Sequence, residues 1–222
     1  MAEAGIAFDE IGAILITHGH WDHVSGIPSL MRHSSATVFM NEGTRNEVEA
    51  LRKLERYELF RSGEKFAFGP FYFEAFDVPH DAAQPVGFKI SCEGVRGLLS
   101  TDLGEMTVPV LDSARSCDWL VMESNHDEEM LRIGPYPWHL KNRVLGRTGH
   151  LSNRALSSFL SGDFDGSAAH LFLAHLSRQN NDPELALDAA ESGIRTRLKQ
   201  GRHCEIAVHL THQHKPSIVL QL

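Results

Sequence analysis

The chain has 222 residues, of which 42% are hydrophobic and 23% charged, and its formal net charge is −8 at pH 7. This composition is typical of a soluble globular protein, and no apolar run approaches the ~18 residues that a membrane-spanning helix needs. The negative charge argues against a protein that binds nucleic acid through its overall charge, although bound metal ions or a local basic patch can reverse the sign at one site. The three cysteines lack Cys-x-x-Cys spacing and predict reduced residues in a cytoplasmic protein with no membrane partner.

The first half of the chain alternates short apolar runs with turn residues. A helical period of apolar residues among many charges indicates a long helix between residues 44 and 60. Gly69-Pro70 and Glu93-Gly94 are typical of tight turns between paired strands. In chain order, we expect a strand at 12–17, a helix at 25–33, a strand at 37–40, a helix at 44–60, a hairpin of strands 65–68 and 71–76, and a hairpin of strands 86–92 and 95–100.

The second half predicts more helix. Ser152 is a typical helix cap, and Pro183 is typical of the first turn of a helix. In chain order, we expect a strand at 119–122, a helix at 127–133, an ordered loop at 134–149, a helix at 152–160, a strand at 170–175, a helix at 183–199, and strands at 206–210 and 217–222 that could close the sheet. The pattern alone supports an α/β or α+β fold, and the lack of repeats or linkers indicates one domain over residues 1–222.

A cluster of potential metal ligands follows the first predicted strand. The segment Thr17-His18-Gly19-His20-Trp21-Asp22-His23 places three imidazoles and one carboxylate within six positions. These groups suit Zn²⁺, Mn²⁺ or Fe. Three more candidates each end an apolar run further along the chain, so each would project from the tip of a strand. The candidate ligands are His18, His20, Asp22, His23, His80, Asp102 and His175.

The pattern His-x-His-x-Asp-His resembles the signature of the metallo-β-lactamase superfamily. The resemblance implies a four-layer αββα sandwich that holds two divalent metal ions, Zn²⁺ or Mn²⁺. By this resemblance, one metal is held by His18, His20 and His80. The second metal is held by Asp22, His23 and His175. Asp102 is expected to bridge the two metals.

The second half of the chain indicates a branch of the superfamily. Gly149-His150-Leu151-Ser152 before a helix, and Leu173 to Ser177 on the next strand, resemble the tRNA 3′-processing endonucleases. Segments from His80 to Asn181 resemble the YycJ/WalJ-like branch of predicted DNA-processing metallohydrolases. The resemblance implies a dinuclear phosphodiesterase, or nuclease, in which a metal-bridging hydroxide attacks DNA ends.

Further residues are candidates for catalysis and substrate binding. Asp22 is expected to be catalytic as well as a ligand, and His150 is the candidate leaving-group acid or phosphate clamp. A helix-capping role remains the alternative for His150. Five residues are expected to contact the substrate: Asn125, His126, Lys141, Arg143 and Arg147. The three basic residues form a patch, which a solvated loop would explain nearly as well. His209, His212 and His214 have no counterpart in the resembling family and are expected to lie on a strand or the surface.

Several alternatives remain open from the sequence. A thioester or ester hydrolase of the glyoxalase II type has the same ligands, and a cyclic-phosphate phosphodiesterase is a nearby possibility. Resembling proteins carry about two strands and a Gly/Ser-rich loop before the first ligand, whereas 17 residues precede His18. This difference predicts either a start upstream of Met1 or a truncated, catalytically incompetent chain. Without those elements, the first sheet would lack edge strands. The oligomeric state is not predicted.

Overall fold

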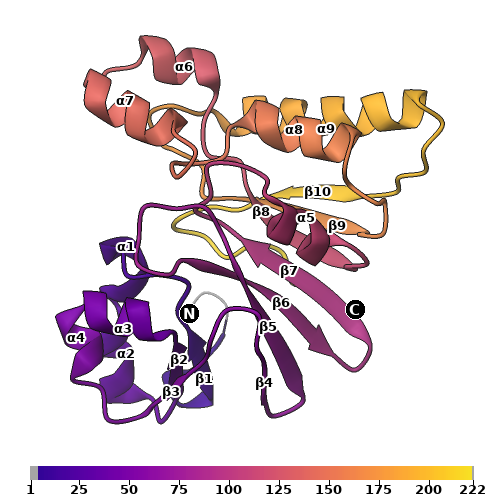
Figure 1. The fold of residues 1–222 in the computed structure, drawn as a ribbon. Helices are drawn as coiled ribbons and strands as arrows, with labels where there is room; N and C mark the ends of the chain where they lie inside the picture. Colours follow the sequence, from indigo (N-terminus) through magenta and orange to yellow (C-terminus); the bar gives the residue numbers. More distant parts are fainter. Residues whose placement is uncertain (1–4, 222) are drawn as a thin grey trace.

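The structure, a computed structural model, describes residues 5–221. Two β-sheets face each other, and helices cover their outer surfaces (Figure 1). In the described residues, the smaller sheet is parallel and has the order β1-β2-β3, formed by Ala13–Leu15, Thr37–Met40 and Tyr57–Leu59. The larger sheet has the order β10-β9-β8-β7-β6-β5-β4. Its strands are β4 (Lys65–Phe68), β5 (Phe71–Asp77), β6 (Val86–Cys92), β7 (Val95–Ser100), β8 (Trp119–Glu123), β9 (His170–Ala174) and β10 (Ala207–Leu210).

Strand β2 shows why the smaller sheet is buried on both faces. Successive side chains of a strand point to opposite faces. Val38 and Met40 therefore pack toward the outer helices, whereas Phe39 packs between the two sheets. The short helical segments around the smaller sheet are η2 (Phe8–Glu10), α1 (Trp21–Val24), α2 (Ile27–His33), α3 (Glu42–Glu47) and α4 (Glu49–Arg52).

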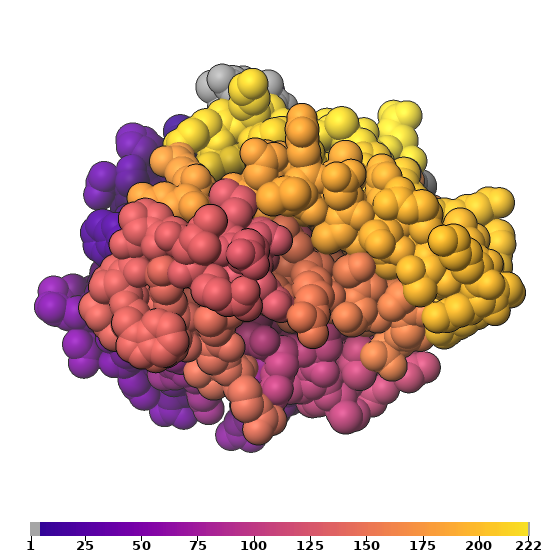
Figure 2. Space-filling model, turned by 90° about the horizontal axis from the view of Figure 1, so that it is seen from above, coloured from indigo at the N-terminus to yellow at the C-terminus, as the bar shows by residue number. Residues whose placement is uncertain are grey.

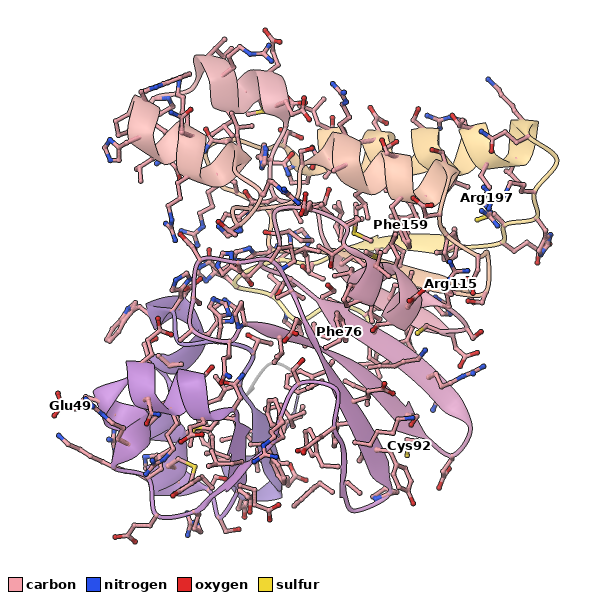
Figure 3. The ribbon with its side chains drawn as sticks, in the orientation of Figure 1. Glu49, Phe76, Cys92, Arg115, Phe159 and Arg197 are labelled. Carbon is pink, nitrogen blue, oxygen red and sulfur yellow. The ribbon has the colours of Figure 1, made fainter. Side chains whose placement is uncertain are left out.

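The larger sheet is mixed. Strands β7 to β10 are parallel, and strands β4 to β7 are antiparallel. Phe76 of β5 and Phe159 of α8, both labelled in Figure 3, belong to the core beneath its outer helices. The remaining helices are α5 (Val108–Ala114), α6 (Glu128–Ile133), α7 (Trp138–Leu145), α8 (Asn153–Ser161) and α9 (Pro183–Lys199). Seen from above, α6 and α7 lie beside the α8–α9 pair on one face of the molecule (Figure 2).

The topology brings several loops to one edge of the larger sheet. Strands β7, β8 and β9 are parallel, so their carboxyl ends meet at the same edge. Strand β5 is antiparallel to β6, which is antiparallel to β7, so the carboxyl end of β5 also reaches this edge. Loops after parallel strands are where α/β proteins commonly place ligand sites.

Two predicted segments differ in the structure. The predicted helix at 44–60 is instead α3, α4 and strand β3, because Val48 takes an extended conformation with φ −112° and ψ 115°. The predicted loop at 134–149 contains helix α7, which begins after Pro137 and buries none of its residues. Pro137 and Gly146 flank this helix, and such turn residues favour the loop prediction.

The prediction for the C-terminal segment was also wrong. Residues 217–221 form no strand, so within the described chain β10 is one of the two edge strands of the larger sheet, with β4 at the other side. The strands expected at 65–68, 86–92 and 95–100 are confirmed, as is the helix at 183–199. Among the described helices, none is both long and apolar enough to cross a membrane.

Candidate metal centre

The first loop of the site follows β1. After β1 the chain passes through Ile16, which is 2% exposed. His20 has an extended backbone and directly precedes helix α1. The hydroxyl oxygen of Thr17 lies 3.1 Å from Nδ1 of His18 and 3.3 Å from Nδ1 of His23. One hydroxyl therefore occupies the Nδ1 side of both rings and leaves their Nε2 atoms for other partners.

His80 enters the site from the loop after β5. Its Nδ1 lies 3.0 Å from the carbonyl oxygen of Gly149, which orients the ring. A backbone carbonyl only accepts, so Nδ1 donates and Nε2 remains as the ligand atom. This Nε2 lies 3.2 Å from Nδ1 of His20. Ligand atoms of His18, His20 and His80 all lie within 4.8 Å of one another.

Asp102 lies between the histidines on the loop after β7. Its Oδ2 is 3.4 Å from Nε2 of His23, and its Oδ1 is 3.9 Å from Nε2 of His80. The residue is 2% exposed and has a φ of 59°, a left-handed conformation that is uncommon outside glycine. The buried carboxylate therefore contacts both ends of the histidine cluster.

A second group of ligand atoms forms where β9 ends. Nε2 of His175 lies 3.8 Å from Oδ2 of Asp22, which is 3.6 Å from Nε2 of His23. These three residues also have ligand atoms within 4.8 Å of one another. His175 has a φ of 57°, and its carbonyl oxygen accepts a hydrogen bond from the side chain of Asn125 at 2.8 Å.

Glu123, at the end of β8, is a site residue to which the sequence analysis gave no role. Its Oε1 lies 2.8 Å from Nδ1 of His150 and 2.9 Å from Nδ1 of His175. Its Oε2 accepts the backbone N–H of Leu103 at 2.9 Å. The side chain has no exposed surface. A carboxylate that ends an apolar strand must find such partners when buried, and that is the sequence signal that could have identified it.

The pKa values of two histidines in the cluster are shifted in opposite directions. Burial, together with repulsion from His23, His80 and His20, lowers the pKa of His18 to about 2. Burial also disfavours a charged His175, but its contacts with the carboxylates of Asp22 and Glu123 outweigh this effect and raise its pKa to about 11.

The two nearby carboxylates have lowered pKa values. Burial disfavours the charged form of Glu123, yet hydrogen bonds from His150 and His175 lower its pKa to about 2. The pKa of Asp22 lies well below its usual value, chiefly because of the neighbouring His175 ring. The site therefore holds ionised carboxylates beside a neutral His18, which is the protonation state that metal binding requires of these groups.

Two buried atoms of the cluster indicate that its residues fit a metal ion. Nε2 of His18 and Oδ2 of Asp102 have no hydrogen-bond partner within the described residues. Leaving such atoms unpartnered is costly. Ligand atoms of His18, His23 and Asp102 lie within 4.8 Å of one another, so one cation could contact both orphaned atoms. Imidazole and carboxylate donors suit Zn²⁺ or Mn²⁺, and the clusters are consistent with a metal site.

The predicted substrate-contacting residues do not all lie on the surface of the site. His126 is 1% exposed, and both of its ring nitrogens lack partners within the described residues. Burial lowers the pKa of this ring. Such burial is at odds with the predicted contact between His126 and a substrate. Asn125 is 8% exposed and supports the backbone of His175.

The predicted basic patch is largely neutralised by carboxylates. The Arg143 guanidinium contacts both oxygens of Asp81, at 2.5 and 3.1 Å. Arg147 pairs with Glu105 at 2.7 Å. The ammonium group of Lys141 instead donates to a backbone carbonyl, at 2.7 Å.

Comparison with known proteins identifies the family. A family model described as a beta-lactamase superfamily domain matches residues 2–161. The chain belongs to the metallo-β-lactamase superfamily. Its clustered His/Asp site and its relatives make it a metal-dependent hydrolase of this superfamily.

Two relatives and one solved structure are notably similar to this chain. Exodeoxyribonuclease YycJ of Bacillus anthracis is 35% identical over 187 residues, which cover 83% of this chain and 71% of that protein. Exodeoxyribonuclease WalJ of Streptococcus pneumoniae is 33% identical over 191 residues, covering 84% and 71%. The crystal structure of Zn²⁺-bound PqqB from Methylobacterium extorquens has a TM-score of 0.65 and 18% identity, covering 95% of this chain and 73% of PqqB. The likeness to PqqB shows the shared fold.

Proposed function

We propose that this protein is a dinuclear metal-dependent nuclease that removes nucleotides from DNA ends. The observation that carries the proposal is that two groups of ligand atoms, one from His18, His20 and His80 and one from Asp22, His23 and His175, both contact the buried Asp102. Within the described residues, Nε2 of His18 and Oδ2 of Asp102 have no hydrogen-bond partner. The two relatives named exodeoxyribonucleases support DNA as the substrate.

In this proposal the ligand atoms divide between two ions. His18, His20 and His80 would hold the first ion. Asp22, His23 and His175 would hold the second, with Asp102 between them. The proximity of ligand atoms within each group supports this division. When bound at such a site, divalent cations lower the pKa of coordinated water and neutralise charge on a phosphodiester.

His150 is proposed to hold the proton that the leaving oxygen receives. Its Nδ1 faces Glu123 at 2.8 Å, so its Nε2 is the nitrogen left for the substrate. The Glu123 carboxylate holds the ring in this orientation. The His150 ring lies 5.1 Å from the His80 ring and 5.2 Å from the His175 ring, between centroids, so it borders both ligand groups.

The test is cleavage of end-labelled single-stranded DNA by protein stripped of metal and then supplied with Mn²⁺ or Zn²⁺. We expect metal-dependent shortening from one end, with at least a 100-fold loss of rate in Asp102→Asn, because an oxyanion ligand is replaced by a neutral amide. Asp188→Asn, an exposed change on α9, is the matched control and should leave the rate unchanged.

The alternatives predict different results in the same assay. Fragments of random length from the first time points would indicate internal cleavage and contradict action at ends. Absence of cleavage with either metal, combined with hydrolysis of a thioester or a cyclic phosphate, would replace the nuclease proposal with one of those activities.

A further inference from the structure

A polar cavity opens beside the second ligand group. It has a volume of about 570 Å³ and is bounded at one end by Asp22, His23 and His175. The loop after β9 and the segment after β10 also line it and contribute Arg178 and His212. Cavities of roughly 300–1,000 Å³ hold small ligands, so one nucleotide fits this space.

The cavity is rich in hydrogen-bond donors. Of the described residues that line it, Asp22 alone carries a carboxylate, although the chain has a net charge of −8. Gln179 and Gln213 contribute amide groups, and Tyr136 contributes an aromatic ring. Such a lining favours an anion with an attached aromatic group, since amides and cations bind phosphate and aromatic rings stack on bases.

Arg178 differs from the arginines of the α7 region. Arg143 and Arg147 are paired with carboxylates. Arg178 forms no ion pair with any carboxylate of the described residues, and its guanidinium contacts the ring of His214. Since an arginine side chain stays protonated, its charge is available to an incoming anion. Arg178 also lines a neighbouring cavity of about 370 Å³ that includes Lys215, so a second cation lies nearby.

We propose that this cavity receives the terminal nucleotide of a nucleic-acid strand and that Arg178 binds its terminal phosphate monoester. A terminal monoester carries a charge of roughly −1.5 to −2 at pH 7, whereas an internal diester carries one negative charge. Arg178 therefore distinguishes a phosphorylated end from the interior of a strand. A nucleotide in this cavity leaves the adjoining linkage beside His175 and Asp22. The inference rests on the proposed nuclease function and gives it a physical basis for acting at ends.

The test is binding of short single-stranded DNA in EDTA, which needs no catalysis. Fluorescence anisotropy compares oligonucleotides with a 5′-phosphate or a 5′-hydroxyl, labelled at the 3′ end, and a second pair with a 3′-phosphate or a 3′-hydroxyl, labelled at the 5′ end. We expect one phosphorylated end to bind about 10-fold more tightly than its hydroxyl counterpart, the effect of one charged hydrogen-bonded contact. Which pair shows the preference identifies the end that is recognised.

Variants of Arg178 decide whether the preference belongs to this cavity. Arg178→Ala should abolish it while leaving affinity for hydroxyl ends within about 2-fold, and Arg178→Lys should retain part of it because only the planar fork is lost. Arg195→Ala, on α9 and paired with Glu191, is the matched control and should keep the full preference. Arg178→Gln serves in place of the alanine variant if that variant does not fold.

Two results would overturn the inference. One is equal binding of phosphate and hydroxyl ends in both pairs by the unmodified protein, and the other is a preference that survives in both Arg178→Ala and Arg178→Gln. The nuclease proposal fails separately. A phosphate preference without metal-dependent cleavage would support this cavity and refute the nuclease, whereas cleavage without any preference would do the reverse.

Discussion

The Nδ1 nitrogen of His150 lies 2.8 Å from Oε1 of Glu123, a carboxylate with no exposed surface. The same oxygen lies 2.9 Å from Nδ1 of His175, so one buried atom orients two rings of the site. Glu123 is itself fixed by the backbone N–H of Leu103. Orientation of a ligand ring by a carboxylate behind it is a common way to set the nitrogen that faces a metal.

Removing the charge of Glu123 should therefore weaken metal binding without changing any ligand. We expect Glu123→Gln to lower Zn²⁺ affinity about 10–100-fold, the usual effect of losing such a partner, because an amide cannot accept from both rings and neutralise them. Competition with a chromogenic chelator measures the affinity. Glu129→Gln, on the exposed surface of α6, is the control; equal affinities in the two variants would show that Glu123 does not support the site.

Without metal, the protein should be most stable near pH 6.5. The pKa of His18 falls from 6.5 to about 2 on folding, so only the unfolded chain takes up this proton and stability is lost as the pH falls below 6.5. The pKa of His175 rises from 6.5 to about 11, so its contribution is complete below pH 6.5 and is lost as the pH rises toward 11. Thermal unfolding in EDTA from pH 4 to pH 10 measures this; a midpoint that rises steadily with pH would contradict the assignment for His175.

Metal binding should release protons near neutral pH. His175 is protonated in the metal-free protein at pH 7 because Asp22 and Glu123 raise its pKa, and a ligand nitrogen must lose its proton. We expect about one proton to be released per protein when Zn²⁺ binds at pH 7, measured by calorimetry in buffers of different ionisation enthalpy. His175→Ala should remove this release. A binding heat that is independent of the buffer would count against a protonated His175.

Gly149 should be more sensitive to enlargement than its neighbour Gly146. A Cβ at Gly149 would lie 2.2 Å from the carbonyl oxygens of Arg143 and Val144, which are backbone atoms, whereas one at Gly146 would meet its nearest atom at 3.2 Å. We expect Gly149→Ala to cost about 1–3 kcal/mol in the free energy of unfolding. It should also lower Zn²⁺ affinity, because the Gly149 carbonyl orients His80. Urea unfolding and chelator competition on both variants test this; equal losses would remove the special role of Gly149.

The basic residues around α7 should contribute unequally to DNA binding. Lys141 contacts no carboxylate of the described residues, so Lys141→Ala should reduce the dependence of log affinity on log salt by about 0.7. Arg147→Ala should change it less, because Glu105 already neutralises the guanidinium. Single-stranded DNA binding at several salt concentrations in EDTA measures both slopes. Glu105→Gln should strengthen binding, and a weaker complex would contradict this reading.

The predictable part of the fold depends on periodicity and turn residues. The strands predicted at 86–92 and 95–100 are confirmed. They could be predicted because the Glu93-Gly94 turn between them is a local signal that sets their pairing. The predicted helix at 44–60 was wrong because the spacing of Val48 and Leu51 fits a helix but cannot reveal that 57–59 pairs with β2. That pairing depends on a strand distant in the sequence, which no local pattern records.

In the site, too, the features set by local patterns could be predicted and those set by contacts between distant residues could not. The sequence placed the predicted ligands at strand ends, and the topology explains why those ends converge. Glu123 and the partners of Arg143 depend on contacts between distant residues, so nothing local to the basic loop predicts its pairing with Asp81. The burial of His126 likewise follows from the packing of the loop after β8, which local composition does not reveal.

The left-handed backbone at Asp102 and His175 limits which changes this site can tolerate during evolution. Aspartate, asparagine and histidine adopt this conformation several times more often than other residues that have a side chain. Two of these three are also common ligands of Zn²⁺. At both positions, the shape of the loop and the chemistry of metal binding therefore favour the same few amino acids. A variant that loses its ligand by mutation to a bulky residue would also strain its backbone, so drift away from metal binding is opposed by folding itself.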